Sequence, residues 1–349
     1  GWDRFELGDI DAGLDDIRVA VDEAMRAKDH GREAYARNRL GLALYQCGST
    51  SSALDELSRS CALASQARGG DAWLRQKTLV ELASTSRKLG AVEQAAHRLL
   101  ELGALGAPVD RGLQATAALE HAALARAFGR CDDALRLVDD AIACADDEGG
   151  PRMRAAARIE RAAILADLGR DDDALAVLDD ALAIAARVQN AAYRAHALLE
   201  AARIRGAQGD VEGARAALDH ADDALAAGED AACEGGVLVE RALLAAHDDE
   251  RAARAFADKA LLVLQRVGGK HLVRALAVAG LVDPARLDER RVAAEALAER
   301  VDDVDAKAAV ALVRGQSAPR EHALARRLSA LLGGKARREM VIGADGRFY

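Results

Sequence analysis

The chain has 349 residues, of which 51% are hydrophobic and only 3% aromatic, and its formal net charge is -9 at pH 7. So few aromatic side chains argue against a large β-sheet domain, and the abundance of alanine, leucine, arginine and glutamate favours helices. A net negative charge makes the whole chain a poor ligand for nucleic acid. Charged residues also interrupt every apolar run before the roughly 20 residues that a membrane-spanning helix needs. The composition therefore predicts an all-α protein.

A repeat close to 40 residues long runs along most of the chain. Six glycines are separated by 40, 42, 39, 40 and 40 residues, and each is followed by a small residue and then, four positions later, by an apolar one. A glycine in the left-handed conformation can end one helix before the next begins, so each unit is predicted to be a helical hairpin. A single hairpin cannot bury its apolar face, and neighbouring hairpins must therefore stack. The glycines are Gly8, Gly48, Gly90, Gly129, Gly169 and Gly209.

Two segments carry a family resemblance. The stretch 40–48 (LGLALYQCG), followed by Ala53, resembles a tetratricopeptide repeat, as does 162–170 (AAILADLGR), followed by Ala174. The resemblance covers residues 1–265 and implies a right-handed α-α superhelix whose first helices line a concave groove. The repeats are longer than the family's usual length of about 34 residues. Long repeats of this kind resemble the arrays of bacterial signalling proteins and of maltose-regulator-like transcription factors.

The first repeat is incomplete. Gly8 precedes its second helix, and only a short stub around Trp2 is present where the first helix should be. An unpaired half-repeat would expose its apolar face. We therefore expect either another segment to cover that end or the chain to be a fragment of a larger bacterial regulatory protein, with further domains at one or both ends.

The repeat period ends near residue 268. We expect residues 1–268 to form the repeat array, and residues 269–332 to form a C-terminal helical cap in which Pro284 and Pro319 occupy first helical positions. Residues 333–349 read as a basic linker followed by the start of a β-hairpin, which gives a short β-like tail.

A row of glutamates, here called the acidic ladder, follows the repeat at steps of 39, 40, 40 and 40 residues. Its position resembles one that contacts ligands in tetratricopeptide arrays, which implies a groove for a protein or peptide partner, with a basic segment as the complementary one. The ladder consists of Glu81, Glu120, Glu160, Glu200 and Glu240. In the alternative interpretation, arginines of adjacent helices pair with the ladder inside the array. The candidates are Arg126, Arg158, Arg161, Arg203 and Arg241.

The C-terminal part carries a candidate basic patch. Its members are Arg326, Arg327, Lys335, Arg337 and Arg338. Such a patch could contact phosphate groups, but no aromatic residues are interleaved to stack on bases. Nucleic acid is therefore an unlikely partner of this chain alone. The alternative is that the array belongs to a transcription regulator and that its basic end adjoins a DNA-binding domain.

The sequence contains no recognisable catalytic, cofactor-binding or metal-binding motif. Its five cysteines include no Cys-x-x-Cys pair and are expected to be reduced thiols of a cytoplasmic protein. The alternative that the chain is an enzyme would require a pocket in which a thiol or a carboxylate lies next to a histidine, and no spacing in the sequence indicates one. We therefore expect a non-catalytic module for protein–protein interaction, acting as a scaffold or sensor, with no catalytic residues, metal or cofactor.

Overall fold

A computed structural model describes residues 1–314, except for 7–8, 67–70, 109, 148–149, 227–229, 247 and 302. The described residues form α-helices and one 3-10 turn, and no strand is found among them. The all-α prediction is therefore confirmed for this part of the chain. The expected helix from Pro319, the basic patch and the β-like tail of residues 333–349 all lie outside the described residues, and the right-handed sense of the superhelix stays a prediction.

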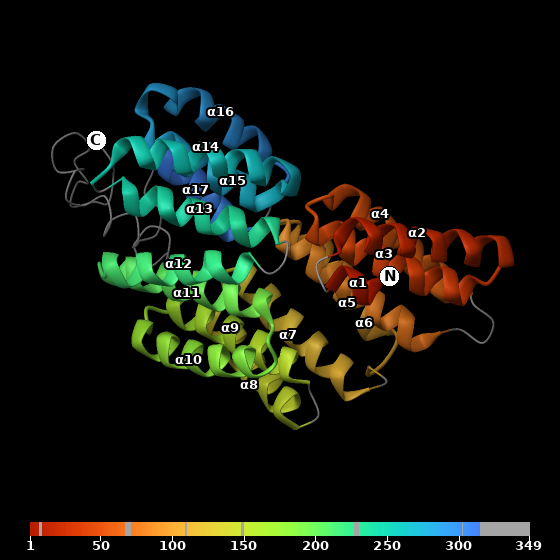
Figure 1. Cartoon of the computed structure of the whole chain (residues 1–349). Coiled ribbons are helices and arrows are strands. Elements are labelled where there is room, and N and C mark those ends of the chain that lie inside the picture. The colour runs from red at the N-terminus through yellow and green to blue at the C-terminus, as the bar shows by residue number, and fades with distance from the viewer. Residues whose placement is uncertain are drawn as a thin grey trace.

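The helices pack in consecutive pairs, and the first helix of each pair from α3 onward also packs on the first helix of the next (Figure 1). The pairs are α3 with α4, α5 with α6, and so on to α13 with α14, so the hairpin prediction is confirmed. The elements are α1 (Trp2–Glu6), α2 (Ile10–Ala27), α3 (His30–Gln46), α4 (Thr50–Gln66), α5 (Ala72–Lys88), α6 (Val92–Ala104), α7 (Arg111–Ala127), α8 (Cys131–Asp147), α9 (Pro151–Asp167), α10 (Asp171–Arg187), α11 (Ala191–Gln208), α12 (Val211–Leu225), α13 (Ala231–Ala245), α14 (Glu250–Val267), α15 (Gly269–Val282), η1 (Pro284–Arg286), α16 (Leu287–Ala298) and α17 (Val304–Val313).

Local sequence explains where these helices begin and end. Five glycines between paired helices have φ between +76° and +86°, the left-handed region in which only glycine is unstrained. Aspartate side chains cap the start of several helices by accepting the free N–H three residues later, as Asp71 does for α5 at 2.9 Å. The predicted turns are therefore confirmed at Gly48, Gly90, Gly129, Gly169 and Gly209.

The core consists mainly of alanine and leucine. On α8, for example, Ala134, Val138 and Ala141 are all fully buried. Small residues allow the two helices of a pair to approach closely. A Cβ added at Gly41 of α3 would lie 2.7 Å from Cγ of Leu57 on α4, so this approach leaves no room for a side chain.

The N-terminal stub is the short helix α1. It packs on α2 and buries Phe5, which is 3% exposed. A Cβ at Gly13 of α2 would lie 2.7 Å from the backbone nitrogen of Phe5. The apolar face of the half-repeat is therefore partly covered by α1 itself.

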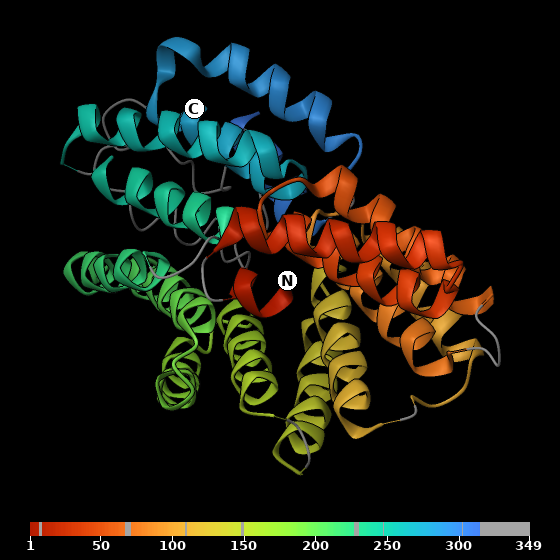
Figure 2. The same ribbon diagram turned by 45° about the vertical axis from the view of Figure 1, so that its right-hand side comes forward.

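The array curves so far that its last helices return to its first repeats (Figures 1 and 2). The backbone N–H of Lys270, at the start of α15, donates a hydrogen bond of 3.0 Å to the carbonyl of Leu89, at the end of α5. Next to this contact, a Cβ at Gly90 would lie 2.5 Å from Cγ1 of Val301. We call this contact region, formed by Leu89, Gly90, Gly269, Lys270 and Val301, the seam.

The C-terminal helices differ from the sequence expectation in one detail. Helix α16 begins at Leu287, whereas the sequence predicted its first residue at Pro284. Pro284 instead starts a 3-10 turn, which is closed by a hydrogen bond of 3.0 Å from the N–H of Arg286 to the carbonyl of Asp283. Proline tolerates such a turn because its fixed φ suits it and its missing N–H needs no partner.

Candidate functional site

A cavity of about 270 Å³ lies on the inner side of the curved array. Side chains of the first helices α9, α11 and α13 form much of its wall, and residues of α5 and α15 approach it from the two sides of the seam. Its apolar lining includes Ile159, Ala163, Leu199 and Val239. Most of the other side chains in the wall are charged, so the cavity offers both apolar and ionic contacts.

Three members of the acidic ladder lie in or directly behind this wall, and every member has a cationic partner within the array. Glu160 and Glu200 line the cavity, and Glu240 lies beneath its lining arginines. The pairs are Glu81 with Lys77 (2.6 Å), Glu120 with Arg87 (3.0 Å), Glu160 with Arg126 (3.6 Å), Glu200 with Arg203, and Glu240 with both Arg203 (3.2 Å) and Arg274. The ladder is thus part of an ion-pair network that links successive repeats.

Two of the arginines named from the sequence pair with the ladder, namely Arg126 and Arg203. The other three face the second helices instead, where they pair with aspartates of α8 and α12. These pairs are Arg158 with Asp146 (2.8 Å), Arg161 with Asp139 (2.7 Å), and Arg241 with Asp219 (2.7 Å) and Asp222 (2.5 Å). The sequence analysis missed the partners Lys77, Arg87 and Arg274. Only Lys77 shows a sequence signal, because it lies one helical turn before Glu81.

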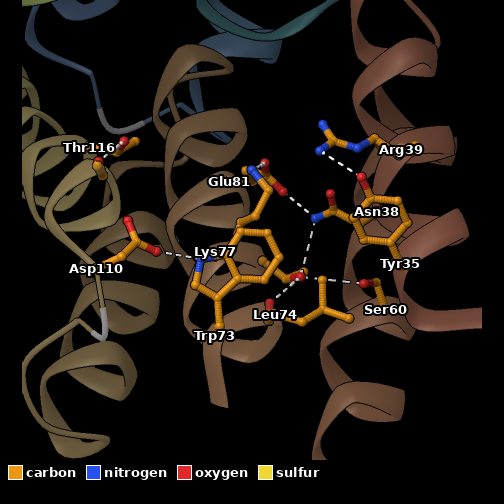
Figure 3. Close-up of polar contacts among 12 residues, drawn as sticks. Tyr35, Asn38, Arg39, Ser60, Trp73, Leu74, Lys77, Glu81, Asp110 and Thr116 are labelled. Carbon is orange, nitrogen blue, oxygen red and sulfur yellow. Dashed lines mark hydrogen bonds and ion pairs between the residues drawn. The ribbon is translucent and has the colours of Figure 1, made fainter. Parts of the chain in front are cut away.

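The N-terminal end of the ladder differs in chemistry (Figure 3). Glu81 also accepts a hydrogen bond from the amide of Asn38 on α3, so two repeats are linked through one carboxylate. In the preceding repeat, Arg39 occupies the ladder position, and its guanidinium lies 5.1 Å from the ring centres of both Trp2 and Tyr35. The repeat before Glu81 therefore has, at the equivalent position, an arginine that contacts two aromatic rings instead of a glutamate.

Burial and charge oppose each other at the ladder. Burial alone would raise the pKa of Glu120, but the charge and hydrogen bonds of Arg87 outweigh it and lower the pKa. Burial likewise disfavours the charged form of Arg203, yet Glu200 and Glu240 raise its pKa. Each partner therefore stabilises the ionised form of the other, and removing one would leave a buried charge uncompensated.

A second polar cluster joins α11 to α13 at the cavity. Nε2 of His196 donates to Oδ2 of Asp230 at 2.9 Å, and Oδ1 of Asp230 accepts the backbone N–H of Cys233 at 2.9 Å. Interactions with nearby Cys233 and with the carboxylate of Asp230 raise the pKa of His196 well above its usual range, although burial opposes this. The pKa of Asp230 falls to about 2, because His196 and the N–H of Cys233 outweigh its burial. His196 and Asp230 therefore form an ion pair at neutral pH.

Cys131 is the first residue of α8, and its thiol is the second one whose surroundings bear on reactivity. Burial raises the pKa of Cys131 to about 11, and nearby Asp167 adds to this effect. The thiol therefore stays protonated at neutral pH and is a poor nucleophile.

The buried imidazole of His271 on α15 is expected to make the stability of the fold depend on pH. Burial and the charges of Lys270 and Arg203 lower the pKa of His271 to about 3, and its Nε2 is buried without a hydrogen-bond partner among the described residues. Below the ordinary histidine pKa of about 6.5, the unfolded chain binds a proton at this residue and the folded chain does not. The free energy of unfolding therefore decreases as the pH is lowered.

We expect the free energy of unfolding of the wild-type chain to fall by about 1.5 kcal/mol more than that of His271→Leu when the pH is lowered from about 6.5 to about 5. Urea unfolding at the two pH values measures this difference. His97 is exposed and serves as the control, because His97→Leu should keep the wild-type pH dependence. An equal loss for wild type and His271→Leu would contradict the assignment.

Within the described ranges, no group of three or more His, Cys, Asp or Glu side chains is arranged to hold a metal ion. The same part of the chain contains no helix long and apolar enough to cross a bilayer.

Comparison with solved structures shows the fold. A Rap protein complexed with competence and sporulation factor is 15% identical, with a TM-score of 0.63 over 94% of this chain and 81% of that one. Aspartyl phosphate phosphatase F from Bacillus subtilis is 12% identical, with a TM-score of 0.56 over 83% of this chain and 73% of that one.

A signal transduction ATPase with a tetratricopeptide repeat sensor, from Pyrococcus horikoshii, is 14% identical with a TM-score of 0.50. It is matched over 82% of this chain, which spans only 46% of the ATPase. No protein-family model and no curated protein matches the sequence. In its fold the chain is a tetratricopeptide-like repeat protein, as the resemblance of its repeats predicted, and this similarity carries no activity with it.

Proposed function

We propose that this chain is a non-catalytic recognition module that binds a peptide or an extended protein segment in the inner cavity. The observation that carries the proposal is the cavity of about 270 Å³ at the concave side of the curved array. A pocket of this size, close to the roughly 300 Å³ at which ligand sites begin, accommodates a few side chains of a partner.

The rigidity of the wall supports this proposal. The ion pairs of the ladder connect the first helices of neighbouring repeats and fix the side chains that line the cavity. A partner therefore meets a preformed surface and loses little of its binding energy to ordering the protein. Apolar contacts with residues such as Leu199 and Val239 supply affinity, and the charged groups around them supply selectivity.

Recognition accounts for the site better than catalysis does. Cys233, His196 and Asp230 combine the residue types of a nucleophile, a base and an orienting acid. However, Cys233 is only 1% exposed, so a substrate cannot reach the thiol in this conformation. We therefore assign these residues to the wall of a binding pocket.

The biological setting remains part of the proposal. A Rap protein complexed with a factor and an ATPase with a repeat sensor are both similar in fold. By analogy, the chain would act as a sensor or scaffold in a larger regulatory protein of the bacterial cytoplasm. A basic partner would have to displace Arg126 or Arg203 from the ladder, so the structure gives that expectation little support.

Affinity selection from a library of short random peptides, read by mass spectrometry, tests the proposal. Ala207 lines the cavity and is half-buried, so Ala207→Phe should fill the pocket and abolish the selection. The matched control is Ala176→Phe, because Ala176 lies exposed on α10. The proposal fails if the wild-type chain enriches no peptides, or if the Ala207→Phe variant enriches the same set.

A further inference from the structure

The last described helix, α17, forms part of the cavity wall. Its first-turn residues Asp305 and Ala306 line the cavity together with side chains of α9, α11 and α13. The rest of the helix packs on α15 and α16, where Val310 joins the buried cluster of Val273 and Ala294 (Figure 1). A helix near the C-terminal end of the described chain therefore covers part of the inner surface that we assign to a partner.

The start of α17 also contacts the turns of two earlier repeats. A Cβ built at Gly90, between α5 and α6, would lie 2.5 Å from Cγ1 of Val301 and 3.4 Å from Cβ of Asp303. A Cβ built at Gly129, between α7 and α8, would lie 3.9 Å from Cγ2 of Val304. These contacts with two consecutive turns place the start of α17 between the first half of the array and its last repeat.

One buried carboxylate holds α17 in this position. Oδ2 of Asp303 accepts a hydrogen bond of 2.9 Å from Nζ of Lys270. Its Oδ1 caps the helix by accepting the backbone N–H groups of Asp305 (3.0 Å) and Ala306 (3.3 Å). The backbone N–H of the same Lys270 binds Leu89 across the seam. We call Asp303 and Lys270 the latch, because together they fix the start of α17 and connect it to the seam.

Helix α17 has little stability of its own. It is 10 residues long, shorter than the roughly 12–15 residues at which an isolated helix becomes marginally stable in water. Three of its residues are valines, whose branched side chains favour the helix only weakly. Its folded form therefore depends on packing and on the latch, so it can open locally while the repeats stay folded.

We propose that α17 is a lid that the latch holds closed over the cavity, and that an extended partner segment displaces this lid when it binds. The inference rests on the proposed function and adds a means of regulating it. In the closed form α17 occupies space that the partner needs. The affinity of the wild-type chain is therefore reduced in proportion to the fraction of molecules whose lid is open, and breaking the latch raises that fraction.

Hydrogen exchange, read by mass spectrometry, measures the opening of α17 directly. The variant is Asp303→Asn, because the amide oxygen of asparagine still caps the helix but carries no charge for Lys270. The matched control is Asp249→Asn, since Asp249 caps α14 through the N–H of Ala252 at 2.9 Å but is exposed and lies outside the cavity wall. A double variant, Lys270→Met with Asp303→Asn, leaves neither charge without its partner and tests the latch even if the single variant does not fold.

We expect the latch variants to speed exchange at the amides of α17 about tenfold, with exchange in α11 unchanged. Peptides selected by the wild-type chain should bind the latch variants about tenfold more tightly, because affinity and exchange both follow the open fraction. An excess of such a peptide should speed exchange in α17 of the wild-type chain. Asp249→Asn should leave the exchange of α17 and the affinity for peptides as they are in the wild-type chain.

Three other outcomes would contradict the proposals. Unchanged exchange in α17, or a rise shared equally by α11, would overturn the latch as the element that holds the lid closed. Faster exchange in α17 without tighter peptide binding would overturn the lid and leave peptide recognition standing. If the wild-type chain enriches no peptides, the proposed function itself fails.

Discussion

Gly269→Ala is expected to open the closed array. Gly269 has φ +55°, and a Cβ built on it would lie 2.2 Å from the carbonyl oxygen of Leu89. This oxygen belongs to the backbone and accepts the N–H of Lys270, so it cannot withdraw without breaking the contact across the seam. The variant must therefore separate α15 from the end of α5.

The measurement is the radius of gyration by small-angle X-ray scattering, together with hydrogen exchange at the amide of Lys270. Gly209→Ala is the matched control, because Gly209 has φ +81° and no atom lies within 4 Å of its built Cβ. Both variants carry the left-handed strain of about 1–2 kcal/mol, but only Gly269→Ala adds the clash. An unchanged radius of gyration in Gly269→Ala would show that the seam does not hold the array closed.

Glu240→Ala is expected to produce the largest loss of stability among the ladder variants. The side chain of Glu240 is 4% exposed and holds two guanidinium groups, those of Arg203 and Arg274. Removing it leaves both cations without this buried partner. The expected cost is about 3–5 kcal/mol in the free energy of unfolding, measured with urea and followed by circular dichroism.

Two further variants separate this effect from the loss of surface charge. Glu212 pairs with Arg215 at 3.1 Å but is 86% exposed, so Glu212→Ala should cost less than about 1 kcal/mol. In a double-mutant cycle, Arg274→Met should reduce the cost of Glu240→Ala, because one of the stranded cations is then absent. If Glu240→Ala lowers the free energy of unfolding no more than Glu212→Ala does, the ion pairs of the ladder do not stabilise the fold.

The sequence predicted the repeat units because their signals are local. A glycine such as Gly129 ends a helix through its own backbone freedom, and residues such as Ala134 and Val138 mark a buried face by their spacing. The periodic spacing also placed the ladder glutamates on equivalent positions of successive first helices. What spacing could not reveal is which side chain each glutamate meets. Arg87 and Arg274 reach the ladder from neighbouring repeats, and their partners lie 33 and 34 positions away in the chain.

The amino-acid sequence by itself determined the helices, their turns, the stacking of hairpins and the row of carboxylates, because each of these depends on residues within one repeat or on its exact recurrence. Only the tertiary structure decided that the array closes on itself and that the ladder is neutralised by cations of its own and neighbouring repeats. The physical reason is that small rotations between successive repeats add up along the array. Their sum determines whether residues far apart in the chain, such as Leu89 and Lys270, come into contact.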